Sequence, residues 1–303
     1  MTNLLRKNYR YICVVGPTAS GKSQLGLELT ERLDGEIVNC DSIQVYKGFD
    51  IGAAKPSQVD YKRASHHLFS FVNCADDYDA RAYARDARGV IEGIESRGKT
   101  PILVGGTGLY LRALWQEDFH VDLPKDEKLR VILAEKSNQD LMQELSRIDP
   151  KRALEIHEND RYRLLRAVEL IRLLGGPVEE RSEKAKSTRG EAFTIFLSPP
   201  RSLLHERINT RTSVMLDEGL IQEVSNLLSQ GCKEDCKPMK AIGYKQVCEY
   251  LNQSMEASAL VPSIQAATRQ YAKRQLTWFR KIQADLVLTD CSPRSIELVL
   301  ESF

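Results

Sequence analysis

Short apolar runs alternate with amphipathic stretches over the first third of the chain. The runs are brief, rich in β-branched residues and bounded by turn residues, which is typical of buried strands. They are YICVV (11–15), the run within EIVNCDS (36–42), HLFSFV (67–72) and PILVGG (101–106). Helices are predicted from Leu25, Leu29 and Leu33, which recur every four residues, over 79–97 before Gly98, and in TGLYLRALWQ (107–116). Strands that alternate with helices in this way predict a parallel α/β sheet.

The pattern changes near residue 119. From there to about residue 174 the chain is charged and helical, and residues 175–192 are polar and rich in turn formers, which predicts a mobile loop. FTIFL (193–197) returns to a strand pattern, long helices follow at about 201–230 and 256–282, and ADLVLTD (284–290) predicts a last strand. We therefore expect an α/β core made of residues 1–118 and 193–303, with a helical insertion at 119–192.

Composition narrows the class of protein. With 303 residues the chain is long enough for a large domain with an insertion, and the formal net charge of +1 leaves only local patches for nucleic acid. The seven cysteines are scattered, and the Cys232/Cys236 pair has no second Cys or His pair nearby, so reduced thiols and no zinc site are expected. The N-terminal apolar run is too short for a signal peptide or a membrane span. A cytoplasmic protein is the resulting prediction.

The stretch GPTASGKS fits the phosphate-binding P-loop pattern. Its residues are Gly16, Pro17, Thr18, Ala19, Ser20, Gly21, Lys22 and Ser23. A predicted strand precedes it and a predicted helix follows, so backbone N–H groups and the helix dipole are expected to hold phosphate. Lys22 would neutralise outer phosphate oxygens, and the Ser23 hydroxyl would lie near a magnesium ion. The motif predicts a phosphorylated ligand without specifying the reaction.

Two polar residues end other predicted strands. Asp41 is expected beside the P-loop strand, where it could hold magnesium through water, act as a general base, or only cap the turn that follows. Thr107 lies in a Gly-Gly-Thr turn, where its hydroxyl could cap the next helix or meet a ligand phosphate.

Basic residues gather on two predicted helices. Arg207 and Arg211 are four positions apart, so they form either a solvated face or a pair of clamps on a charged oxygen. ATRQYAKRQLTWFRK (267–281) contains no acid, which suits either a solvated helix with inward aromatics or a phosphate-backbone contact. His66 and His67 have no third ligand at metal spacing.

Several motifs together resemble one family, the tRNA dimethylallyltransferases. They are GPTASGKS (16–23), DSIQVYKGFDIGAAKP (41–56), PILVGGTGLYL (101–111), HENDRYRLLRAVE (157–169), the Arg207/Arg211 helix, KAIGYKQ (240–246) and ATRQYAKRQLTWFR (267–280). They span almost the whole chain in the family's order. The resemblance implies a P-loop NTPase-like parallel sheet core with a helical insertion domain.

The resemblance also implies an activity and roles for residues. The family moves a dimethylallyl group from dimethylallyl diphosphate to the exocyclic amine of the adenine just 3′ of the tRNA anticodon. By this analogy Lys22 and Ser23 hold the leaving diphosphate with Mg²⁺, Asp41 accepts the amine proton, and Thr107 and Arg211 meet the diphosphate charge. The implied tRNA contacts are Asp41, Ser42, Ile43, Gln44, Thr107, Arg130, Tyr162, Arg163, Leu164, Leu165, Arg166, Lys240, Ala241, Ile242, Gly243, Tyr244 and Lys245. Arg130 is matched across a one-residue length difference.

Small departures and two alternatives accompany this resemblance. Ser23 stands where many members have Thr, and the C-terminal zinc finger of eukaryotic members is missing, so a bacterial-type enzyme is expected. For the oligomeric state, a monomer is the default expectation. The P-loop alone would equally suit a small-molecule or nucleotide kinase with residues 119–192 as its lid. The basic 267–281 stretch would suit an RNA-binding module without catalysis.

Overall fold

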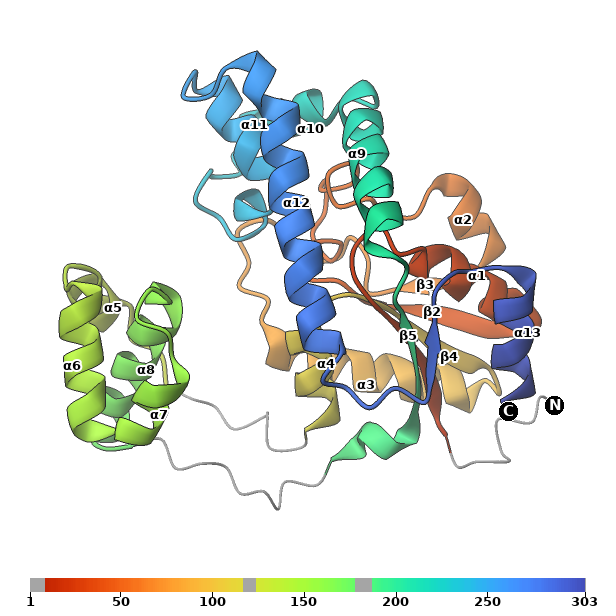
Figure 1. The fold of residues 1–303 in the computed structure, drawn as a ribbon, viewed down its shortest axis with the longest axis horizontal. Coiled ribbons are helices and arrows are strands. Elements are labelled where there is room, and N and C mark those ends of the chain that lie inside the picture. The colour runs from red at the N-terminus through yellow and green to blue at the C-terminus, as the bar shows by residue number, and fades with distance from the viewer. Residues whose placement is uncertain (1–8, 117–123, 178–186, 303) are drawn as a thin grey trace. The chain divides into compact units, whose positions relative to one another are not determined.

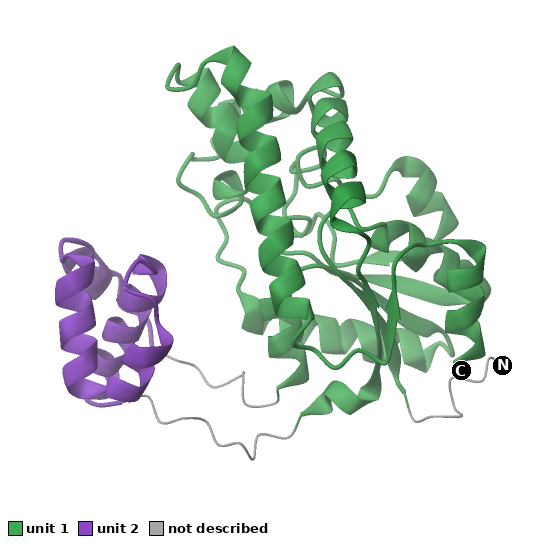
Figure 2. Cartoon of the chain, in the orientation of Figure 1, with its two compact units in different colours: residues 1–119, 187–303 green, residues 120–186 purple. Residues whose placement is uncertain are grey.

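The chain divides into two compact units, described here from a computed structural model. Residues 9–116, 124–177 and 187–302 are described. One unit comprises residues 1–119 and 187–303, and the other residues 120–186, as Figure 2 shows. Residues 187–192, which the sequence assigned to the insertion, belong to the first unit. There Thr188 donates to the Leu114 carbonyl at 3.3 Å, and the Arg189 guanidinium lies 5.8 Å from the Trp115 ring centroid.

The first unit is built on a parallel sheet of six strands in the order β3-β2-β4-β1-β5-β6 (Figure 1). The strands are β1 (Tyr11–Val15), β2 (Gly35–Cys40), β3 (His66–His67), β4 (Thr100–Gly105), β5 (Ala192–Leu197) and β6 (Leu286–Leu288). The register pairs Val15 of β1 with Gly105 of β4, and Cys40 of β2 with the same Gly105. The parallel α/β core is therefore confirmed. The expectation that the Asp41 strand adjoins the P-loop strand is wrong, because β4 lies between them.

Helices cover both faces of this sheet. Along β1 the side chains alternate, so that Cys13 and Val15 lie in one hydrophobic cluster and Ile12 and Val14 in the other. The first cluster includes residues of α3 (Ala80–Ser96) and α4 (Gly108–Trp115), and the second those of α1 (Lys22–Arg32) and α13 (Pro293–Glu301). Burial on both faces explains why the strand sequences are continuously apolar.

Two predicted elements differ from the structure. The run 67–72 is not a strand beyond His67, because Leu68 (φ 63°) and Ser70 (φ 50°) adopt left-handed backbone conformations that interrupt an extended chain. The predicted helix at 201–230 is two helices, α9 (Arg201–Asp217) and α10 (Leu220–Ser229), separated at Gly219 with φ 102°. The remaining elements of this unit are α2 (Gln58–Arg63), η3 (Thr188–Glu191), η4 (Pro238–Lys240), α11 (Tyr244–Leu251) and α12 (Ala257–Phe279).

The second unit is helical where it is described. It contains α5 (Glu127–Ala134), α6 (Asn138–Ile148), α7 (Pro150–Glu155) and α8 (Arg161–Leu174) around its own apolar cluster. Glu169 is buried in it, with ion pairs to Arg130 at 2.9 Å and Arg166 at 2.6 Å. Burial alone would raise the pKa of Glu169, but hydrogen bonds from the Asp126 N–H and both arginines outweigh it and lower that pKa. Of the predicted loop 175–192, residues 178–186 lie outside the described residues.

The cysteines are not all reduced thiols. Cys74 and Cys232 form a disulfide across a sequence separation of 158 residues, so the expectation of reduced thiols is wrong for this pair. Their spacing gave no signal, because the fold alone brings the two segments together. No cluster of three or more metal-ligating His, Cys, Asp or Glu side chains occurs among residues 9–116, 124–177 and 187–302. In the same part of the chain, no helix is long and apolar enough to cross a membrane.

Candidate active site

Three loops meet at the carboxyl edge of the sheet. The P-loop follows β1, Asp41 follows β2 and Thr107 follows β4. Since β2, β4 and β1 are neighbours in that order, their C-terminal ends lie side by side. This edge is where open α/β sheets bind ligands.

The P-loop contains a half-buried cation, Lys22. Lys22 opens α1, and its Nζ donates to the Pro17 carbonyl at 2.5 Å. Burial lowers the pKa of Lys22 to about 7, with Asp41 opposing and Arg211 reinforcing this effect. In the described part of the chain this half-buried ammonium donates to a neutral carbonyl, so it is placed to bind an anion, which would offset the cost of its desolvation.

Arg207 and Arg211 of α9 face the P-loop rather than solvent. Arg207 donates to the Ser20 carbonyl at 3.2 Å and Arg211 donates to the Thr18 hydroxyl at 3.1 Å. Burial lowers the pKa of Arg211, which Asp41 partly offsets. Of the two interpretations of this helix, the geometry favours the clamp.

The Asp41 carboxylate stabilises the turn that follows β2. Its Oδ1 accepts the N–H groups of Ile43 at 2.8 Å and Gln44 at 3.3 Å, and its own N–H donates to Asn39 Oδ1 at 2.9 Å. Among the described residues, both hydrogen bonds that its carboxylate accepts end on Oδ1. The turn-cap interpretation is therefore correct for one oxygen, and Oδ2 is left for another donor.

Thr107 does not cap its own helix. It lies at the N-cap position of α4 without a side-chain cap hydrogen bond, and its Oγ1 accepts the Ser42 N–H at 3.0 Å. The Thr107 N–H in turn donates to the Cys40 carbonyl at 3.1 Å. Thr107 thus ties the β4 loop to the segment that carries Asp41.

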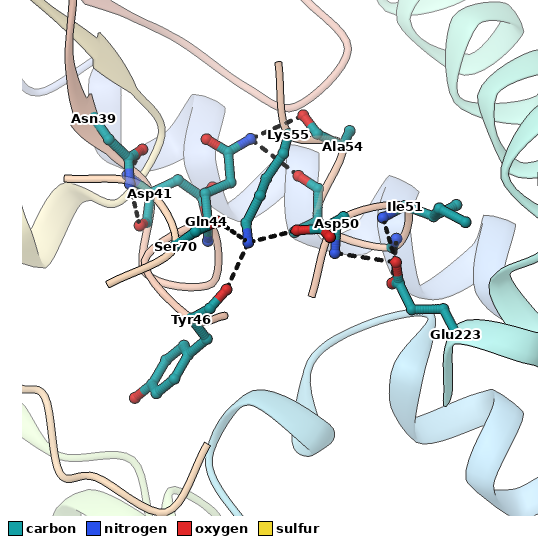
Figure 3. Close-up of polar contacts among 12 residues, drawn as sticks. Asn39, Asp41, Gln44, Tyr46, Asp50, Ile51, Ala54, Lys55, Ser70 and Glu223 are labelled. Atoms are coloured by element: carbon teal, nitrogen blue, oxygen red, sulfur yellow. Dashed lines mark hydrogen bonds and ion pairs between the residues drawn. The ribbon is translucent and has the colours of Figure 1, made fainter. Parts of the chain in front are cut away.

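A polar network, which sequence analysis did not identify, fixes the loop after Asp41. Figure 3 shows the Gln44 amide donating to the Ala53 and Ala54 carbonyls at 3.0 and 2.9 Å. In the same view Lys55 donates to Tyr46, Asp50 and Ser70, and Glu223 of α10 accepts backbone N–H groups from residues 50–52. Glu223 carries no sequence signal, because the backbone N–H groups that it accepts are about 170 residues away along the chain.

Two clefts meet at these residues. The large cleft, of about 1040 Å³, is lined by residues 18–24 of the P-loop segment and by Gln44, Asp50 and Arg207 among others. The small cleft, of about 320 Å³, is lined by Ser42, Ile43, Lys240, Ala241, Ile242, Gly243 and Tyr244 among others. Both are lined by Thr18, Asp41, Ala53, Arg211, Met215 and Tyr271. A phosphate-binding loop and a second opening therefore share Asp41 and Arg211.

The remaining residues expected to contact tRNA differ in exposure. Tyr162 is 81% exposed and Arg163 is exposed, but Leu164 belongs to the core of the second unit. Tyr244 is also fully buried. Neither Leu164 nor Tyr244 has exposed surface in this structure, although Tyr244 lines the small cleft.

Other members of that set lie at the surface of their units. Arg130 and Arg166 are half-buried and tied to Glu169, whereas Leu165 is half-buried against the second unit's core. Lys245 is exposed and pairs with Glu249 at 3.7 Å.

The sequence profile of a family described as "IPP transferase" matches residues 44–282. The chain belongs to the IPP transferase family. That family assignment favours a transferase over a kinase or a non-catalytic RNA-binding module.

Relatives and solved structures agree with the IPP transferase assignment. The chain is 45% identical over 279 residues to "tRNA dimethylallyltransferase 2" of Geotalea uraniireducens, covering 90% of this chain and 89% of the relative. It is similar to the tRNA isopentenylpyrophosphate transferase of Bacillus halodurans, with a TM-score of 0.71, 35% identity, and 96% of this chain and 94% of that one covered. It is also similar to a eukaryotic dimethylallyltransferase acting on tRNA, with a TM-score of 0.77, 28% identity, and 94% of this chain and 74% of that one covered.

Proposed function

We propose that this protein transfers a dimethylallyl group from dimethylallyl diphosphate to the exocyclic amine of the adenine 3′ of the tRNA anticodon. The observation that carries the proposal is that one carboxylate, Asp41, lines both the P-loop cleft and a second cleft. The names of the IPP transferase relatives support the substrate classes.

The proposed reaction is a displacement at the allylic carbon. The exocyclic nitrogen attacks that carbon, the carbon–oxygen bond breaks with its electrons on diphosphate, and the amine proton passes to Asp41 Oδ2. The amine is a poor nucleophile because its lone pair is delocalised into the purine, so removal of its proton in the transition state helps. Asp41 suits this role because its other oxygen is engaged by the Ile43 and Gln44 N–H groups, which fix the carboxylate.

Departure of the diphosphate is assisted by fixed positive charge. Lys22, Arg207 and Arg211 all line the large cleft beside the P-loop. Cations that are already in place stabilise developing charge without reorganisation of solvent. The Ser20 hydroxyl is buried without a hydrogen-bond partner in the part of the chain that is described. It is therefore free to donate a hydrogen bond to a diphosphate oxygen held by the P-loop.

A magnesium ion fits the donors present. Ser23 lines the large cleft and offers a hard oxygen ligand of the kind that Mg²⁺ prefers. Because Mg²⁺ usually takes much of its coordination from water and substrate phosphates, few protein oxygens are needed. The ion would neutralise diphosphate charge, with Ser23 as its P-loop ligand.

For tRNA we propose two contact regions. The first is the mouth of the small cleft at Lys240–Ile242, and the second is the exposed start of α8 with Tyr162 and Arg163. Single-stranded RNA bases are commonly stacked on aromatic side chains, which suits the exposed Tyr162, and the target adenine would be flipped out to reach Asp41. A monomer in the cytoplasm completes this proposal.

The test is nucleoside analysis of unmodified tRNA after incubation with the protein, Mg²⁺ and dimethylallyl diphosphate. Mass spectrometry is expected to find adenosine heavier by one dimethylallyl group, and a Lys22→Met control is expected to produce much less. Turnover of ATP without this product would instead support the kinase alternative and overturn the proposal.

A further inference from the structure

Helix α12 lays a stripe of side chains across the site. Tyr271, Gln275 and Trp278 are spaced at i, i+4 and i+7, so they share one helix face. Tyr271 lines both clefts, Gln275 lines the large cleft, and Trp278 lies against the start of α4. Trp278 packs against the apolar cluster of the first unit while Lys273, Arg274, Arg280 and Lys281 are exposed, which agrees with a solvated helix whose aromatic side chains point inward.

Gln275 bridges two loops of the site with one amide group. Its Oε1 accepts the Thr18 N–H of the P-loop at 2.8 Å, and its Nε2 donates to the Gly106 carbonyl of the β4 loop at 2.8 Å. A backbone N–H can only donate and a carbonyl can only accept, so the orientation of the amide is fixed by its partners. The side chain is buried, with 6% exposed, so neither bond is replaced easily by water.

Two glycines of the β4 loop allow this approach. A Cβ on Gly106 would lie 2.4 Å from Gln275 Nε2, and a Cβ on Gly108 would lie 2.5 Å from the Trp278 ring. These are the glycines on either side of Thr107, so the Gly-Gly-Thr-Gly turn is shaped to receive α12. Helix docking thereby explains Gly106 and Gly108, whereas a Cβ on Gly105 would meet the Cys40 carbonyl oxygen of β2.

We propose that Gln275 is a positioning residue for the transfer, which sets the P-loop at a fixed distance from the loop that carries Thr107. This inference rests on the proposed function. The Thr18 hydroxyl accepts a hydrogen bond from the Arg211 guanidinium. The Thr107 hydroxyl accepts one from the N–H of Ser42, the residue that follows Asp41. Gln275 therefore couples the diphosphate cradle to the base, and it acts through these groups without touching the reacting atoms.

The first test replaces the amide by an apolar group of similar size. Gln275→Leu is expected to lower kcat about 10- to 100-fold, because two buried backbone groups lose their partner, while KM for tRNA stays within about threefold. The matched control is Gln270→Leu on the same helix, where the side chain is exposed and lines neither cleft. This control is expected to leave kcat unchanged.

The second test uses a group whose donor can be switched by pH. In Gln275→Glu the ionised carboxylate accepts the Thr18 N–H but cannot donate to Gly106, whereas the protonated acid restores both bonds. The activity of Gln275→Glu divided by that of the wild type is therefore expected to rise about tenfold from pH 8 to pH 6. For the control Gln270→Glu, the activity divided by that of the wild type is expected not to change between pH 8 and pH 6. All activities are measured at one fixed Mg²⁺ concentration.

The outcomes separate the two proposals. A flat ratio for Gln275→Glu together with an unchanged kcat for Gln275→Leu would overturn the positioning role. If Gln275→Leu fails to fold, the pH ratio of Gln275→Glu decides alone. If the wild type forms no dimethylallyl adenosine, the proposed function fails, whereas an active wild type with pH-insensitive variants refutes only the role of Gln275.

Discussion

The two carboxylate oxygens of Asp41 have different roles. Oδ1 holds the turn through the Ile43 and Gln44 N–H groups, and we assign the proton transfer to Oδ2. Asn at this position retains the Oδ1 acceptor and loses the base. Asp41→Asn is therefore expected to keep tRNA affinity within about threefold and to lower kcat about 10²- to 10⁴-fold. Filter binding and single-turnover kinetics measure the two quantities, and a kcat within tenfold of the wild type would remove Asp41 from the proton transfer.

Lys22 predicts a pH dependence of diphosphate binding. Burial lowers its pKa to about 7 in the free protein, so the ammonium form is complete well below pH 7 and is lost as the pH rises through that value. Binding of an anion needs the ammonium form, so affinity for inorganic diphosphate is expected to fall by up to about tenfold per pH unit above pH 7.

Calorimetry from pH 6 to pH 9 measures this fall. Ionisation of diphosphate itself acts equally on a Lys22→Met variant, so the ratio of the two affinities isolates the lysine. A ratio that does not change with pH would contradict the assignment of this group.

At the scale of elements, two glycine substitutions are expected to change the free energy of unfolding in opposite directions, because only one of the two glycines lies where α12 packs against α4. Gly108→Ala would place a Cβ 2.5 Å from the Trp278 ring and is expected to destabilise the protein by about 1–3 kcal/mol. Gly89→Ala, inside α3 with nothing within 4 Å of the added Cβ, is expected to stabilise it by about 0.5–1 kcal/mol. Urea unfolding of both variants measures the difference, and equal effects would show that the close approach is relieved cheaply.

Elements were predictable where local pattern decides them. The strands at 11–15 and 101–106 follow from apolar runs and the helix at 79–97 is closed by Gly98, and the structure has β1, β4 and α3 there. The run 67–72 has a strand-like composition, but its backbone is bent by tertiary hydrogen bonds such as Ser70 N–H to the Gln44 carbonyl. The composition of residues 67–72 does not reveal a hydrogen-bond partner elsewhere in the chain.

The candidate site was predictable to the same extent. The P-loop, Asp41, Thr107 and Arg211 could be named because each belongs to a local motif at a strand end or on a helix. Gln275 and Glu223 could not, because the backbone groups that they bind in the site's loops lie more than 165 residues away along the chain. The strand order also had to come from the fold, since β4 enters between β1 and β2 late in the sequence.

At the scale of the whole molecule, the second unit is expected to be separable. Gln116 and Ser187 form an antiparallel bridge, so the chain ends that flank this unit are already adjacent. Replacement of residues 120–186 by a short Gly-Ser linker is expected to leave diphosphate affinity within about threefold and to weaken tRNA binding at least tenfold. Calorimetry and filter binding test this, and undiminished tRNA affinity would argue against the contact proposed for Tyr162 and Arg163.

The Cys74–Cys232 bond makes a closed ring of the chain between these residues, and the whole second unit lies within that ring. A protease that cuts once between residues 120 and 186 opens the ring without releasing either part. The nicked protein should therefore migrate at full mass on a denaturing gel without reductant, and as two fragments once reductant is added. Nicking thus converts a single polypeptide into a two-chain molecule joined by one covalent bond.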